Sequence, residues 1–298
     1  MPRAVILRAP AKINLTLRVG PRLESGYHDV RTVIQTVSLF DTLTITPRRG
    51  PFALQTRTPG VPADQTNLVW RAAELLWRSA GREGAPRDAH VRLAKEIPAA
   101  AGLGGGSSDA AAALAGLNRV WDLRRSARDL MELAAALGAD VPYFLVGGSA
   151  LGAGRGDELY PLEDVAGFGV LIIKPSFGVS TADAYRWCDE DRAAGGGAPV
   201  ALPARRPLDL GWASGPLALV NDLEEPVARR HPEIREMVDA CYREGAAAAA
   251  MTGSGSAVFG LFSEAAASRA ARRLRRPDWL VLITRTLTRR EAGRRMSL

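Results

Sequence analysis

The chain has 298 residues, which is more than one compact hydrophobic core usually holds, so we expect two domains or one elaborated domain. Hydrophobic residues make up 47% and charged residues 24%, a composition that excludes a collagen-like, coiled-coil or mainly disordered protein. The net charge is +7, and two cysteines alone, Cys188 and Cys241, exclude a disulfide framework or a cysteine-rich metal site.

The first half of the sequence carries both strand and helix patterns. From Ile13 to Val19 apolar and polar residues alternate, which predicts a half-buried strand with Lys12 and Asn14 on one polar face. Ser107 or Ser108 is expected to cap a helix that runs through the following alanines. The remaining patterns predict strands around residues 43–45 and 90–94, and helices over residues 67–79, 107–121 and 126–137.

The second half has a different order of elements. A buried strand is expected over residues 168–173, after a glycine-rich passage, and we place a domain boundary near residue 155. The order of strands and helices favours an α+β layer of the ferredoxin-like type. Residues 192–215 are rich in Gly, Pro, Ala and Arg, which predicts a long surface insertion. The other expected elements are helices over 181–188, 226–243 and 264–275 and strands over 246–251, 256–262 and 279–287.

Positive charge is concentrated at the end of the chain. Residues 269–298 contain ten arginines against Asp278 and Glu291, a net charge of +8. Several of these arginines recur at helical spacing, which is typical of the solvated face of an amphipathic helix, although a basic tail also suits nucleic acid or anionic lipid. Lysine occurs only at positions 12, 95 and 174, so each lysine is expected to be present for its compact, rotatable ammonium group.

The most informative segment is a glycine-rich stretch between a predicted strand and a predicted helix. Four of the five residues from Gly102 to Gly106 lack a side chain, so backbone N–H groups can turn toward a bound anion. The helix that follows adds unpaired N–H donors and the positive end of its dipole. The spacing fits neither the Walker A loop nor the G-x-G-x-x-G fingerprint. The segment therefore predicts a phosphate site, with a purely structural turn as the alternative.

Five segments together resemble the GHMP kinases, and the resemblance covers nearly the whole chain. In chain order they are Ala9-Pro-Ala-Lys-Ile-Asn-Leu15, Gly26-Tyr-His-Asp29, Pro98-Ala-Ala-Ala-Gly-Leu-Gly-Gly-Gly-Ser-Ser108, Leu137-Gly-Ala-Asp-Val-Pro142 and Met251-Thr-Gly-Ser-Gly-Ser-Ala-Val-Phe259. The resemblance implies the α+β, two-domain GHMP kinase fold. We expect an α/β nucleotide-binding domain over residues 1–155 and a ferredoxin-like α+β domain over residues 156–298 that contributes to the substrate cleft.

The resemblance also implies the residues that hold ATP and those that catalyse transfer. Asp140 is the implied base, and Lys12 is implied to keep Asp140 ionised and to act on the substrate hydroxyl or the γ-phosphate. From the local sequence alone, the alternatives are that Asp140 organises a turn and that Lys12 is an exposed strand lysine. Mg²⁺ is expected to bridge the ATP phosphates, and no metal ligand is assigned. The implied ATP-binding residues are Pro98, Ala99, Ala100, Ala101, Gly102, Leu103, Gly104, Gly105, Gly106, Ser107 and Ser108.

The resemblance implies a substrate that is a methylerythritol with a cytidine diphosphate group, phosphorylated on its 2-hydroxyl, and Gly26-Tyr27-His28 resembles the segment that recognises the cytidine. The ring of Tyr27 is available to stack on a base, His28 to hydrogen-bond the base edge, and Tyr185 to close the other side. The alternatives are that His28 is an ordinary surface histidine and that Tyr185 is an ordinary core tyrosine. The implied substrate-binding residues are Asn14, Tyr27, His28, Thr181 and Tyr185, and Asp109 and Asp222 are acidic residues without an assigned role.

Two other functions are compatible with parts of the sequence. One is a GHMP kinase for another alcohol such as mevalonate or homoserine, against which Tyr27 and His28 argue. The other is a nucleic-acid-binding protein that uses the arginines of residues 269–295, although we expect no nucleic-acid partner. No stretch approaches the roughly 18 consecutive apolar residues of a spanning helix, and the first apolar run is too short for a signal peptide. We therefore expect a cytoplasmic enzyme without a membrane partner, whose oligomeric state the sequence leaves open.

Overall fold

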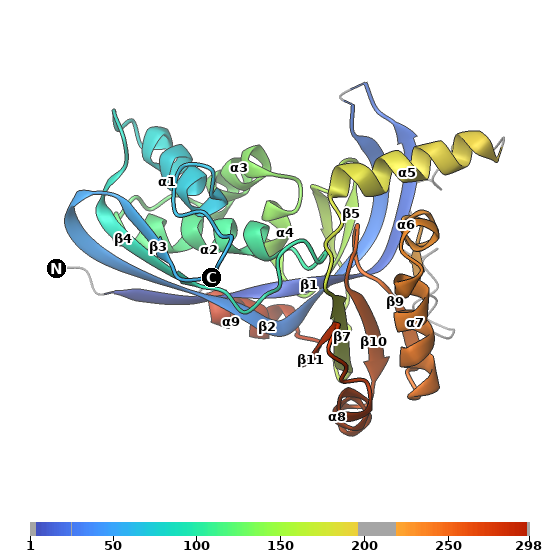
Figure 1. Cartoon of the computed structure of the whole chain (residues 1–298). Coiled ribbons are helices and arrows are strands. Elements are labelled where there is room, and N and C mark those ends of the chain that lie inside the picture. Colours follow the sequence, from blue (N-terminus) through green and yellow to red (C-terminus); the bar gives the residue numbers. More distant parts are fainter. Residues whose placement is uncertain (1–3, 25, 196–218, 297–298) are drawn as a thin grey trace.

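The computed structural model describes residues 4–24, 26–195 and 219–296, which form two sheets with helices packed on them (Figure 1). The first sheet has the strand order β3–β4–β2–β1–β8, with β5 paired to β2 and β6 paired to β5. Its strands are β1 (Val5–Arg22), β2 (His28–Pro51), β3 (Ala53–Thr56), β4 (Arg87–Ala94), β5 (Ser149–Ala153), β6 (Glu158–Pro161) and β8 (Val220–Asn221).

The long antiparallel pair of β1 and β2 extends across both halves of the molecule, as Figure 1 shows in blue. Ile13 and Leu15 of β1 are fully buried, as the alternation predicts. Lys12 and Asn14, on the other face, are also buried, at 4% and 5% exposure, so the prediction of a half-buried strand was wrong. The reason is tertiary: the glycine-rich loop and residues 252–253 cover this face.

Helices pack on the first sheet and set the position of the glycine-rich loop. The helix α2 is rich in alanine and lies close to the sheet. At Gly116 the approach is so close that a Cβ atom there would meet Ile45 Cδ1 at 2.5 Å. Its first residues follow a loop that lies beside the middle of β1, where the backbone N–H of Lys12 donates to the carbonyl of Leu103. The helices of this half are α1 (Leu68–Ser79), α2 (Gly105–Val120), α3 (Ala127–Leu137), α4 (Val141–Val146) and the C-terminal α9 (Arg289–Met296), which contacts β1 and α4.

The second sheet has the order β11–β7–β10–β9 with antiparallel neighbours. The helix α7 packs on β9 and β10, and α8 packs on β7 and β11. This arrangement confirms the predicted α+β class. The elements of this half are β7 (Gly169–Pro175), α5 (Thr181–Ala194), α6 (Glu224–Arg230), α7 (Glu233–Arg243), β9 (Ala248–Met251), β10 (Val258–Phe262), α8 (Glu264–Arg273) and β11 (Trp279–Arg285). The boundary near residue 155 stays a prediction.

Several predicted elements differ from the structure. The single helix expected over 226–243 is two helices, because Pro232 lacks an N–H and pushes His231 out of helical geometry, to φ −133° and ψ 80°. The helix α2 begins at Gly105, so neither Ser107 nor Ser108 caps it. Residues 192–194 of the expected insertion belong to α5, and residues 196–215 lie outside the described part of the chain.

The arginines after residue 269 lie largely on α8, β11 and α9, and several pair with acidic side chains. The pairs are Arg273 with Glu244 at 3.2 Å, Arg276 with Glu236 at 2.7 Å and Arg285 with Glu291 at 2.8 Å. This pairing favours a solvated surface over a nucleic-acid tail. Within the described ranges, no helix is both long enough and apolar enough to cross a membrane.

Candidate active site

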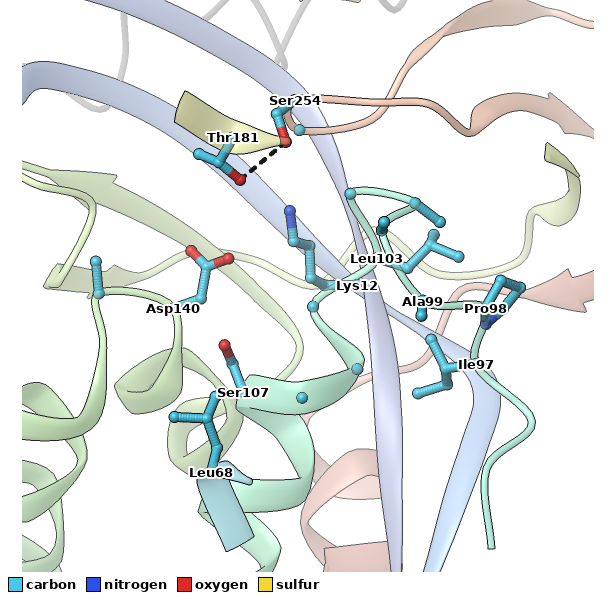
Figure 2. Close-up of a pocket in the computed structure, with 18 of the residues that line it drawn as sticks. Lys12, Leu68, Ile97, Pro98, Ala99, Leu103, Ser107, Asp140, Thr181 and Ser254 are labelled. Carbon is cyan, nitrogen blue, oxygen red and sulfur yellow. Dashed lines mark hydrogen bonds between the residues drawn. The ribbon is translucent and has the colours of Figure 1, made fainter. Parts of the chain in front are cut away.

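A cleft of about 670 Å³ opens where the two sheets meet, and most of the residues predicted to be functional line it (Figure 2). The glycine-rich loop forms one wall, the start of α4 another, and the start of α5 with residues 253–255 closes the top of the view. The predicted residues that line the cleft are Lys12, Asn14, Tyr27, Pro98, Ala99, Ala100, Ala101, Gly102, Leu103, Gly104, Gly105, Gly106, Ser107, Asp140, Thr181 and Tyr185.

The glycine-rich loop needs glycine at two positions because of both backbone angle and space. Gly102 has φ +72°, and a Cβ atom there would lie 2.0 Å from the carbonyl oxygen of Thr252. Gly104 has φ +71° and would place a Cβ atom 2.7 Å from the ring of Phe144 and 3.1 Å from Lys12 Cγ. The loop is therefore packed tightly between the two halves of the protein.

The amino end of α2 faces the cleft. Its N-cap is Gly104, which has no side chain to accept from the first N–H groups of the helix. These groups and the positive end of the helix dipole are available to an anion in the cleft. Ser107 lines the opening, whereas the side chain of Ser108 is fully buried and its Oγ has no hydrogen-bond partner among the described residues.

Lys12 lies at the centre of the site and is held by Asn14 of β1 and by the glycine-rich loop. Its Nζ donates to Asn14 Oδ1 at 2.5 Å, and its backbone N–H donates to the carbonyl of Leu103 at 3.0 Å. Asn14 Nδ2 in turn donates to Thr32 Oγ1 at 2.7 Å, and the backbone N–H of Asn14 donates to Thr252 Oγ1 at 3.0 Å. Burial lowers the pKa of the Lys12 ammonium, and the nearby charge of Asp140 partly offsets this effect.

Asp140 is the residue directly before α4. Figure 2 shows its carboxylate and the Lys12 ammonium extending into the same space, with Ser107, Thr181 and Ser254 around it. Its side chain makes no capping hydrogen bond to α4 within the described part of the chain, so the turn-organising alternative has no contact to support it. Thr181 Oγ1 and Ser254 Oγ lie 3.1 Å apart and join the start of α5 to the third glycine segment.

Two tyrosines line the other end of the cleft. Tyr27 is 57% exposed, and the guanidinium of Arg155 lies over its ring at 5.4 Å from the centroid. Tyr185 is largely buried, which raises the pKa of its phenol. His28 is buried and stacks on Tyr185 with the ring centroids 5.0 Å apart, and its Nε2 lies 2.9 Å from Asp189 Oδ1.

Sequence reasoning missed several polar residues at this site. Arg155 and Asp189 contact Tyr27 and His28 across long sequence separations, which no local pattern reveals. Lys95 was signalled by the scarcity of lysine, and it lines the cleft close to Asp109.

Asp222, which the sequence analysis left without a role, pairs with Arg18 and accepts from the backbone N–H of Val19, outside the lining of the cleft.

Known protein families and relatives are similar to most of this chain. The family model described as GHMP kinases N terminal domain matches residues 67–148, and the model described as GHMP kinases C terminal matches residues 201–277. The 4-diphosphocytidyl-2-C-methyl-D-erythritol kinase of Pelotomaculum thermopropionicum is 43% identical over 95% of this chain and 98% of its own length. The protein of the same name from Moorella thermoacetica is 41% identical over 95% and 99%.

Solved structures show the same likeness. A crystal structure of 4-(cytidine 5'-diphospho)-2C-methyl-D-erythritol kinase is 34% identical, with a TM-score of 0.78 over 95% of this chain and 99% of its own. A homoserine kinase from Cytophaga hutchinsonii is 18% identical, with a TM-score of 0.70 over 97% and 96%, and shares the fold.

Proposed function

The chain belongs to the GHMP kinases and, among them, to the 4-diphosphocytidyl-2-C-methyl-D-erythritol kinases, and from this premise we propose that it uses ATP to phosphorylate the 2-hydroxyl of that alcohol. One observation carries the proposal. A single cleft contains the amino end of α2, the side chains of Lys12 and Asp140, and two tyrosine rings. A triphosphate, a nucleophilic hydroxyl and a nucleotide base are what this transfer must hold together.

The loop of residues 98–108 is proposed to hold the phosphates of ATP. Support comes from the uncapped first turn of α2, whose N–H groups and dipole favour negative charge at this end of the cleft. When bound with ATP, Mg²⁺ would neutralise charge on the phosphates. The described residues contain no group of three or more His, Cys, Asp or Glu side chains able to hold a metal ion.

Asp140 is proposed as the base and Lys12 as its cationic partner. As the 2-hydroxyl oxygen bonds to the γ-phosphorus, the bond from that phosphorus to the bridging oxygen of ADP breaks, and the hydroxyl proton passes to the Asp140 carboxylate. The buried Lys12 ammonium stabilises negative charge on the transferring group. Asn14 supports this role because it holds Lys12 Nζ through its side-chain oxygen.

The cytosine is proposed to stack at the tyrosine end of the cleft, between Tyr27 and Tyr185. His28 is proposed to recognise the base edge. Its contact with Asp189 fixes the orientation of the imidazole, while Thr181 contributes a hydroxyl to the lining of the cleft at the start of α5. As part of the same proposal, the reaction takes place in the cytoplasm, where ATP is available.

A coupled ADP-release assay tests this function. Purified protein is supplied with MgATP and one acceptor at a time: the cytidine-linked alcohol, 2-C-methylerythritol, mevalonate or homoserine. Turnover is expected with the first acceptor alone, because the other three have no base for the tyrosine rings. Faster turnover with mevalonate or homoserine would instead identify a GHMP kinase for another alcohol.

A further inference from the structure

Asp41 of β2 is a buried carboxylate that the proposed reaction does not use. It is fully buried and does not line the cleft. Its Oδ1 accepts from the backbone N–H groups of Glu96 at 2.6 Å and Ile97 at 2.8 Å, and its Oδ2 accepts from Lys95 Nζ. These three donors directly precede the glycine-rich loop. One side chain thus fixes the entry to the loop.

Lys95 extends this contact to the exit of the loop. Its Nζ also donates to Asp109 Oδ2 on α2 at 2.6 Å, so the buried chain Asp41–Lys95–Asp109 joins β2, the end of β4 and the first turns of α2. Gly105 allows the close approach, because a Cβ atom there would lie 3.1 Å from Lys95 Nζ. Both ends of the loop are therefore tied to one hydrogen-bonded set of ionisable side chains.

A buried carboxylate is costly unless it is paired and hydrogen-bonded, so Asp41 is stable only while the three donors stay in place. A loop so rich in glycine otherwise loses much conformational entropy when it is ordered around a ligand. We propose that Asp41 is a positioning residue that pre-organises the loop of residues 98–108 for the phosphates of a nucleoside triphosphate. This inference rests on the proposed function, in which that loop binds ATP.

Substitutions at Asp41 distinguish a role in positioning the loop for ATP from an effect on the stability of the whole protein. Asp41→Ala removes all three contacts, whereas Asp41→Asn keeps an oxygen for the two backbone N–H groups and loses the carboxylate for Lys95. Asp222→Ala is the matched control, since Asp222 also accepts from a backbone N–H and pairs with a cation, away from the cleft. MgADP affinity is measured by calorimetry, and the KM values for ATP and for the cytidine-linked alcohol by ADP release.

Asp41→Ala is expected to raise the Kd for MgADP and the KM for ATP about 10- to 100-fold, the order of effect of misplacing binding groups by about 1 Å. The KM for the alcohol should change less than about twofold, Asp41→Asn should recover part of the loss, and Asp222→Ala should bind MgADP like the wild type.

Two results would overturn the inference: unchanged MgADP affinity in a folded Asp41→Ala variant, or equal increases in both KM values. If Asp41→Ala does not fold, the same measurements on Asp41→Asn decide the question, and wild-type affinity there would overturn it. A wild-type protein that does not bind MgADP would instead contradict the proposed function itself, before any variant is compared.

Discussion

Replacing Gly102 by alanine is expected to destabilise the protein strongly, whereas the same change at Gly106 is not. At Gly102 the left-handed backbone costs an alanine about 1–2 kcal/mol. The added Cβ atom would also lie 2.0 Å from the carbonyl oxygen of Thr252, so backbone must move, at about 1–3 kcal/mol for a local overpacking. The expected loss is the sum of the two effects, about 2–5 kcal/mol, a large part of the typical 5–15 kcal/mol of a folded domain.

Gly106 is the matched control because it lies in the same loop motif, inside α2. Its nearest neighbour for an added Cβ atom is Leu68 Cδ1 at 3.7 Å, an ordinary contact distance. Alanine is favoured over glycine in a helix by up to about 1 kcal/mol, so Gly106→Ala should leave stability unchanged or slightly raise it. Thermal unfolding followed by circular dichroism measures both variants. A Tm for Gly102→Ala within about 2 °C of the wild type would refute this reasoning.

Four further outcomes are expected for residues of the site. Asp140→Asn should lower turnover by about 10²- to 10⁴-fold in the ADP-release assay, the usual contribution of a general base. Lys12→Met should also lower turnover but not Tm, because burial already disfavours the charged ammonium. Tyr27→Ala should raise the KM for the cytidine-linked alcohol about 5- to 150-fold, as expected for the loss of 1–3 kcal/mol of base stacking, while Tyr27→Phe should not. Finally, burial raises the pKa of Asp109 to about 7 from 3.8. The folded protein therefore binds this proton more tightly than the unfolded chain does. The stability that protonated Asp109 contributes is consequently lost as the pH rises from about 4 through 7. The Tm of the wild type minus that of Asp109→Asn should therefore fall across this range.

Each of these predictions has an outcome that contradicts it. Near-normal turnover in both Asp140→Asn and Lys12→Met would show that Asp140 is not the base and that Lys12 is not its cationic partner. Equal KM values for Tyr27→Ala and Tyr27→Phe would show that the ring does not stack on the base. A difference in Tm between the wild type and Asp109→Asn that stays constant from pH 4 to pH 7 would show that this carboxyl does not titrate there.

Much of the fold was predictable because its helices carry clear signals. Asn67 accepts from the N–H of Val69 at the start of α1, and Ser126 caps α3 in a reciprocal capping box. The six-residue α4 was not predicted, because so short a helix shows no periodicity. The start of α2 was misplaced because glycine is a poor helix former, whereas the helix begins at Gly105, where an added Cβ atom would lie 3.0 Å from Ile97 Cγ2 and 3.1 Å from Lys95 Nζ.

The site was predictable only where its residues lie within a motif. Lys12 and Asp140 lie in two of the five segments, and the cleft contains them both, although their chemical roles stay predictions. Asp189 was not found, because it is 161 residues from His28 and lies just beyond residue 188, where the predicted helix ended. Asp41 was not found either, because a single Asp inside a long strand gives no sign of the backbone donors it accepts from.

Phosphoryl transfer to the 2-hydroxyl of 4-diphosphocytidyl-2-C-methyl-D-erythritol can be detected by ³¹P NMR of the product without proton decoupling. Carbon 2 of this alcohol bears the methyl group and no hydrogen, so a phosphate ester at its hydroxyl has no proton on the adjacent carbon. Transfer to the 2-hydroxyl predicts a new monoester resonance that is a singlet, beside unchanged diphosphate resonances. A monoester resonance split by adjacent protons, or ADP release without any new ester, would contradict it.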